Sequence, residues 1–94
     1  MLSQLPINLA KIAPNNIDQE ILRLGMIAEL DAVSLYEQLA AETEESTIKK
    51  LLIDIAKEEK THIGEFQAML LKLDPEQVRE LEAGRKEVEE LEEK

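Results

Sequence analysis

Residues 48–69 read IKKLLIDIAKEEKTHIGEFQAM, and apolar side chains recur through them every three or four positions. This spacing predicts an α-helix with one apolar face. Two polar residues, Glu59 and His62, fall inside that face. A carboxylate buried without a partner is costly unless it takes up a proton, so something must compensate for it. We favour a bound metal cation, because the spacing of three residues aims an oxygen ligand and a nitrogen ligand at one point.

The length and composition predict an all-α protein that self-associates. The 94 residues suffice for one small domain, residues 1–94. Apolar residues make up 44% of the chain, with one Phe, one Tyr and no Trp, so the apolar content is aliphatic and spread over long stretches. A chain this short cannot bury all of that surface, and we expect a homo-oligomer.

The charge balance excludes several classes of partner. The net charge is −10, from 21 acidic and 11 basic residues. This balance disfavours nucleic acid and anionic membranes and attracts cations. The absence of Cys excludes disulfides and thiolate ligands and is consistent with a reducing, cytoplasmic location. We find no signal peptide and no stretch typical of a membrane span.

Three helices are expected after an extended arm at residues 1–15. Asn15 and Asn16 are expected to cap a first helix at 17–43, in which Gly25 permits close approach of a neighbouring backbone. The second helix is expected at 46–73 and the third at 75–92, with Asp74 as cap and Pro75 at the favoured first position. The first two helices are predicted to form an antiparallel hairpin. The third carries a narrow apolar seam that we expect to pack on a neighbouring subunit.

The hairpin would place a third polar group beside the first two. Glu29 lies 15 or 16 residues before a turn at 44–45, and Glu59 lies 14 or 15 residues after it. At about 1.5 Å of rise per residue, both carboxylates sit roughly 22 Å from the turn. Glu29 therefore faces the Glu59/His62 pair.

These ligands amount to half of a known pattern. Ferritin-like bundles build a di-iron centre from two Glu residues and two Glu-x-x-His pairs, spread over four helices. This chain offers one of each and a single His, so it cannot complete the centre alone. Two copies related by a two-fold axis could, giving a four-helix bundle with two metal ions at the dimer interface. Carboxylates with one imidazole suit Fe(II), Mn(II) or Zn(II).

Two stretches, ELDAVSLYEQ at residues 29–38 and EEKTH at 58–62, resemble the encapsulated ferritins, and the resemblance extends over residues 17–75. It implies a ferroxidase that oxidises Fe(II) with O2 and supplies iron for storage inside an encapsulin nanocompartment. It also implies dimers that close into a decameric ring. Glu29, Glu59 and His62 match the catalytic metal ligands of the family. Asp31 matches an acidic metal-access position, and Tyr36 an aromatic residue beside the centre.

The sequence departs from the family at two positions. Ala28 stands where some members have an acid, and Leu35 where some have Trp, which affects the access route rather than the centre. The stretch LDPEQV at residues 73–78 is similar to members fused to the encapsulin shell. A separate cargo protein and the N-terminal domain of a fusion both remain open.

Alternative interpretations remain at each position. His62 could bond only to Glu58 or Glu59, and Glu29 could pair with a neighbouring Lys or Arg. Asp31 could be a partly exposed helix acid and Tyr36 a packing residue. For the whole protein, the rivals are a rubrerythrin-like di-iron peroxidase and a non-enzymatic oligomeric helical adaptor whose polar patch fixes the register.

Overall fold

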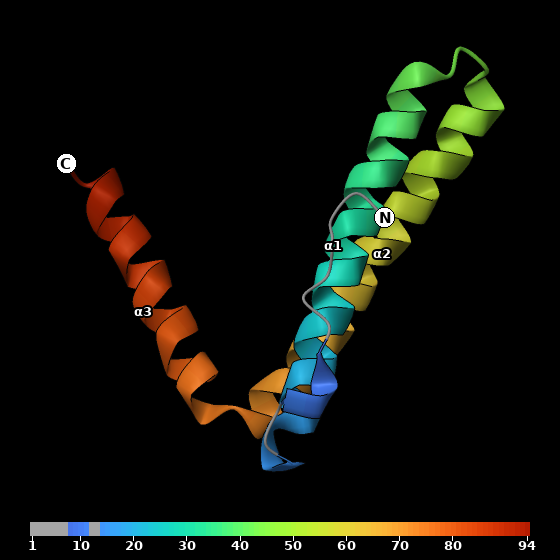
Figure 1. Ribbon diagram of the computed structural model, residues 1–94. Coiled ribbons are helices and arrows are strands. Elements are labelled where there is room, and N and C mark those ends of the chain that lie inside the picture. The colour runs from blue at the N-terminus through green and yellow to red at the C-terminus, as the bar shows by residue number, and fades with distance from the viewer. Residues whose placement is uncertain (1–7, 12–13) are drawn as a thin grey trace.

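The computed structural model describes residues 8–11 and 14–94, which are almost entirely helical. Helices α1 (Ile17–Glu42) and α2 (Ser46–Leu73) lie side by side as an antiparallel hairpin, and α3 (Pro75–Glu92) leaves its open end at an angle (Figure 1). Two short 3-10 helices, η1 (Leu9–Lys11) and η2 (Pro14–Asn16), precede α1. The expected all-α fold is confirmed. No helix in the described part of the chain is both long enough and apolar enough to cross a membrane.

The helices follow the expected boundaries closely, but the N-terminal segment does not. Helix α1 ends one residue earlier than expected, and the bounds of α2 and α3 coincide with the expected ones. The extended arm is wrong where the structure describes it, because 9–11 and 14–16 are 3-10 turns. Residues 1–7 and 12–13 lie outside the described residues. Asn16 occupies the N-cap position of α1, yet its side chain makes no capping hydrogen bond there.

Two side chains at the start of α2 hold the hairpin turn. Glu45 is the N-cap of α2, and its carboxylate accepts a hydrogen bond of 2.7 Å from the backbone N–H of Ile48. Lys49 reaches back across the turn and donates from Nζ to the carbonyl of Ala40 at 2.6 Å. That carbonyl is among the last four of α1, which have no partner within their own helix. The turn is therefore held by contacts that set the register of the hairpin.

The core between α1 and α2 is narrow. Its buried apolar residues are Val33, Ala40, Ala56 and Leu70. Two of these are alanines, which allow the helix axes to approach closely. Twelve large apolar side chains of the described residues are exposed, far more than the hairpin buries. The single chain therefore leaves an incomplete apolar core, as expected for a protein that self-associates.

Asp74 joins α3 to the hairpin. Its Oδ1 accepts a hydrogen bond from the backbone N–H of Gln77 at 3.1 Å, which confirms the expected cap. Its Oδ2 lies 3.4 Å from Nη1 of Arg23 in α1. Gln19, also in α1, donates from Nε2 to the carbonyl of Leu73 at 2.8 Å. Side chains of α1 therefore hold the junction at which α2 ends and α3 begins.

Beyond this junction α3 is stabilised by its own side chains. Arg85 donates hydrogen bonds to Glu82, one turn earlier, and to Glu89, one turn later. The hydrogen bond from Arg85 holds the pKa of Glu82 below its usual value. None of the residues of α3 is buried, and its apolar seam of Val78, Leu81, Val88 and Leu91 is exposed. The packing of this seam on a neighbouring subunit stays a prediction.

We expect Asp74→Ala to lower the free energy of unfolding by about 1 kcal/mol, because it removes a helix cap. Asp74→Asn should cost only a few tenths of that, since Asn caps almost as well and the partly exposed ion pair with Arg23 contributes little. Urea denaturation followed by circular dichroism measures both. Asp54→Ala removes an exposed carboxylate from the middle of α2 and serves as the control. Equal losses for the two Asp74 variants would assign the effect to the charge.

Candidate metal centre

The hairpin brings together the three residues that the sequence singled out. Glu29 projects from the middle of α1, and Glu59 and His62 project from neighbouring turns of α2. The Nδ1 atom of His62 lies 3.4 Å from Oε2 of Glu59 and 3.5 Å from Oε2 of Glu29. Counting residues from the turn predicted this meeting, because the register of an antiparallel hairpin is fixed at its turn.

The carboxylates are largely withdrawn from solvent. The side chains of Glu29 and Glu59 are 20% and 19% exposed, whereas His62 is 45% exposed. The Oε2 atom of Glu29 is buried and has no hydrogen-bond partner among the described residues. Its neighbour His62 carries at most one proton on Nδ1, which cannot serve both carboxylates. An unsatisfied buried acceptor costs about 1–3 kcal/mol, so a cation held here would remove a real penalty.

The donor set fits a divalent transition metal. Within the part of the chain that the structure describes, Glu29, Glu59 and His62 form one group whose ligand atoms all lie within 4.8 Å of one another. Two carboxylate oxygens and one imidazole nitrogen suit Fe(II), Mn(II) or Zn(II). Three protein ligands leave coordination positions open, which is typical of sites that react rather than merely stabilise.

The other two predicted site residues lie outside this group. Asp31 is 6% exposed, so its interpretation as a partly exposed helix acid is wrong. It is two residues from Glu29 and therefore projects from a different side of α1. Tyr36 is half-buried two turns along α1 from Glu29. The metal-access role of Asp31 and the position of Tyr36 beside the centre stay predictions.

Lys60, the residue after Glu59 in α2, is paired with a carboxylate of α1, a contact that the sequence did not indicate. Lys60 directly follows Glu59, and its Nζ lies 3.3 Å from Oε2 of Glu37 in α1. Among the described residues, Glu29 lies within ion-pairing distance of His62, which is charged only if protonated, and is not paired with a Lys or Arg. A cationic side chain in the centre would compete with a metal ion. The Lys60–Glu37 pair is exposed, and Lys60 is not among the residues of the cluster.

The centre opens onto an apolar face that spans both helices. On α2, residues in helical register with His62 are apolar and 42–57% exposed, namely Ile48, Leu51, Met69 and Leu73. On α1, Ile21 and Leu39 share a face with Gly25, and the position of Gly25 lies against the ring of Phe66 on α2. Since Phe66 is one turn from His62, the two stripes are adjacent. We call these six exposed residues and His62 the apolar face.

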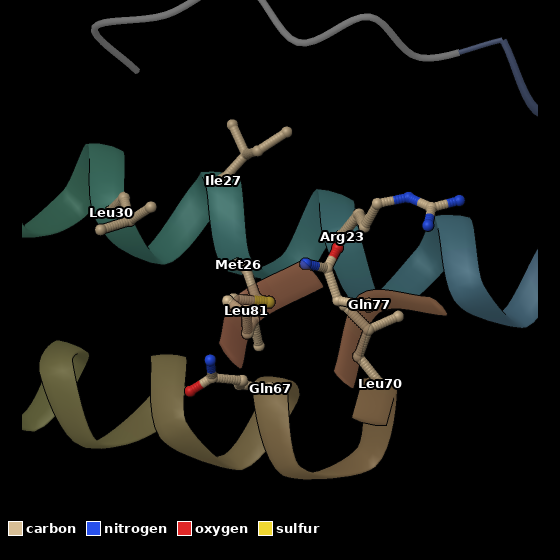
Figure 2. Close-up of a pocket in the computed structure, with 8 residues that line it drawn as sticks. All are labelled: Arg23, Met26, Ile27, Leu30, Gln67, Leu70, Gln77 and Leu81. Atoms are coloured by element: carbon tan, nitrogen blue, oxygen red, sulfur yellow. The ribbon is translucent and has the colours of Figure 1, made fainter. Parts of the chain in front are cut away.

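A separate pocket lies where α3 meets the hairpin. It has a volume of about 270 Å³ and mainly apolar walls, with contributions from all three helices (Figure 2). None of the three candidate ligands lines it. Arg23 is its one charged residue, and that side chain is already paired with Glu20 and Asp74. The residues that line the pocket include no acid–base pair and no set of metal ligands, so the cluster of Glu29, Glu59 and His62 is the stronger candidate for a functional site.

An all-α hairpin that carries a Glu and a Glu-x-x-His pair defines the class of ferritin-like carboxylate proteins. A family model described as Rubrerythrin matches residues 20–94. The crystal structure of the encapsulated ferritin domain from Pyrococcus furiosus superposes with a TM-score of 0.82 and 54% identity, covering 97% of this chain and 95% of that one. The chain therefore belongs to the rubrerythrin family and, within it, to the encapsulated ferritins.

Two curated relatives are longer than this chain. A ferritin-like–encapsulin shell fusion protein of Pyrococcus furiosus is 61% identical over 72 residues, which cover 77% of this chain and 21% of that protein. The encapsulin nanocompartment cargo protein EncC of Myxococcus xanthus is 38% identical over 56 residues, covering 60% of this chain and 43% of that protein. The matched part of the chain thus covers about a fifth of the first relative and less than half of the second.

Replacing Glu29 by Met should raise the free energy of unfolding of the metal-free protein by about 1 kcal/mol, because it removes a buried, unsatisfied carboxylate oxygen. The same variant should lose the stabilisation that Co(II) gives the wild type, since a ligand stabilises only the state that binds it. Thermal unfolding with chelator and with Co(II) measures both effects. Glu58→Met, an exposed neighbour of the centre, should show neither. A destabilised, still metal-responsive Glu29→Met protein would contradict this account.

Proposed function

We propose that the protein is a ferroxidase that binds Fe(II) between two copies of the chain and oxidises it with O2. The buried oxygen of Glu29 carries this proposal, because it lies beside Glu59 and His62 without a hydrogen bond. A hydrophobic contact or a simple helix–helix polar pair would not leave such an atom unsatisfied. Iron would be the substrate of this reaction.

A second copy of the chain would complete the centre. Each copy contributes two carboxylates and one imidazole, half of what a di-iron site needs. The cluster opens onto the apolar face, so a two-fold axis through that face would bring two half-sites together. The same contact would cover the exposed side chains of the apolar face, which the hairpin cannot bury alone.

In the completed centre, this chain's residues would hold and position the ions. Glu29 and Glu59 would be bridging or terminal ligands, and His62 a terminal ligand through a ring nitrogen. Two Fe(II) ions supply one electron each, and one O2 accepts both with two protons to leave as hydrogen peroxide. The carboxylates favour the more highly charged product because they are hard, anionic donors. The open positions of the site allow O2 to enter and Fe(III) to leave.

The product would be stored outside this small protein. The relatives are named as an encapsulin cargo protein and as a fusion to an encapsulin shell. By analogy, dimers of this chain would assemble into a decameric ring inside a cytoplasmic encapsulin nanocompartment, as cargo or as a fused domain. The shell would then receive the Fe(III) for mineral storage.

A rubrerythrin-like di-iron peroxidase is the second candidate, favoured by the family model that matches residues 20–94. It would reduce hydrogen peroxide and would need an external reductant, since the chain has no Cys for a rubredoxin-type iron site. Oxidation of Fe(II) by peroxide that greatly outpaces oxidation by O2 would favour it. An oligomeric adaptor, the third candidate, would bind no stoichiometric Fe(II).

His62→Ala and Glu59→Ala should reduce the rate of Fe(II) oxidation about tenfold or more while the protein stays helical, because each removes a metal ligand. Glu58→Ala, which removes an exposed carboxylate from the same turn, is the matched control. Anaerobic Fe(II) titration followed by air, monitored by absorbance, measures binding and oxidation. The wild type should bind one Fe per chain. Near-normal rates of Fe(II) oxidation in both ligand variants would contradict the assignment of the site.

Metal should also promote assembly, because the half-sites repel one another until a cation joins them. Sedimentation velocity of the metal-free protein should show smaller species than the same sample with Fe(II) under anaerobic conditions. The Glu29→Met variant should lose this response. Identical sedimentation with chelator and with Fe(II) would show that assembly does not depend on metal binding.

A further inference from the structure

Gly25 faces the ring of Phe66 across the helix pair. A Cβ atom built at Gly25 would lie 2.7 Å from Cε1 of Phe66 and 2.9 Å from its Cδ1 and Cζ. Carbon atoms in ordinary contact are about 3.5–4.0 Å apart. The ring therefore occupies space that any other residue at position 25 would fill.

This contact lies directly beside the metal centre. Gly25 is four residues before Glu29 on α1, and Phe66 is four residues after His62 on α2. Because the helices run antiparallel, both steps lead in the same direction, away from the hairpin turn. One helical turn is about 5.4 Å, so the Gly25–Phe66 contact forms the adjacent layer of the helix interface.

We propose that the Gly25–Phe66 contact positions the metal ligands, by setting how closely α1 and α2 approach beside Glu29 and His62. Phe66 acts as a positioning residue, and Gly25 supplies the space for its ring. The proposal rests on the function proposed above in so far as the cluster binds metal. Its structural part concerns only the placement of His62 relative to Glu29.

The composition of the core explains why one contact has this influence. The buried apolar residues of the hairpin are small or aliphatic, and Phe66 is the only phenylalanine of the chain. The structure can accommodate a Cβ at position 25 in two ways. Either α1 and α2 separate and the 3.5 Å contact between Glu29 and His62 lengthens, or the ring rotates onto the apolar face that carries His62. Both responses displace a ligand or alter its surroundings.

The chain contains its own control. A Cβ built at Gly64, two residues after His62 on α2, meets nothing within 4 Å. Both glycines lie inside helices, so alanine brings the same gain in helix propensity at either position. A difference between Gly25→Ala and Gly64→Ala therefore reports the contact with the ring.

The first test is Co(II) affinity, measured by titration of the 94-residue chain without oxidation chemistry. Gly25→Ala should weaken binding about tenfold or more, the range for changes in residues that orient metal ligands. Gly64→Ala should stay within about twofold of wild type. In a Phe66→Leu background, which lacks Cε1 and Cζ, Gly25→Ala should cost less than about twofold relative to Phe66→Leu alone.

The second test needs no metal. His62 is the only histidine of the chain, so the Cε1–H group of its ring gives a single, assignable signal in the NMR spectrum. At fixed pH and with chelator, Gly25→Ala should move that signal in the Phe66 protein and leave it unmoved in the Phe66→Leu protein.

The outcomes separate the two proposals. A wild type that binds no Co(II) overturns the metal function, while the His62 signal still tests the positioning. A wild type that binds Co(II), with Gly25→Ala unchanged in affinity and in the His62 signal, overturns the positioning alone. Equal losses for Gly25→Ala and Gly64→Ala would also overturn it, because the effect would then not involve the ring.

Discussion

The register of the α1–α2 hairpin is the constraint on which the rest of the molecule depends. Glu45 and Lys49 fix it at the turn, where one caps the new helix and the other binds a free carbonyl of the old one. Because both helices are straight continuations from that turn, the register decides which side chains meet some four helical turns away. It brings two carboxylates and an imidazole together as one candidate metal-binding group.

In a single chain, the buried carboxylates of the candidate centre oppose the stability that the small apolar core provides. The hairpin buries few large apolar side chains, yet it withdraws two carboxylates from water and leaves one oxygen without a hydrogen bond. A protein designed to be stable alone would replace such groups with hydrophobic residues. Metal and a second copy would reduce both deficits together, because cations would neutralise the carboxylates and the partner would cover the apolar face. Metal binding and self-association would then be coupled in the same patch of surface.

The sequence predicted the features that follow from regular geometry. Apolar periodicity located the helices, Asp74 and Pro75 marked the start of α3, and counting from the turn placed Glu29 opposite Glu59. It failed where an outcome depends on packing or on an unusual cap. Glu is a poor N-cap by propensity, so Glu45 gave no signal, and Asn16 is a good one but makes no capping hydrogen bond. The sequence suggested that Gly25 permits close approach, but only the structure identifies Phe66 as the neighbour.

Helix α3 is joined to the hairpin at Asp74, so a rotation at this junction displaces the far end of the helix. One oxygen of its carboxylate caps α3 and the other binds Arg23 of α1, so the direction of α3 is referenced to the hairpin and not to α2 alone. An 18-residue helix extends roughly 27 Å from that point, and its far end moves by about 0.5 Å for each degree of rotation at the junction. The distance between the tip of α3 and the candidate metal centre therefore depends on the angle at this junction. A small rotation there would displace the exposed apolar seam of α3 and leave Glu29, Glu59 and His62 in place.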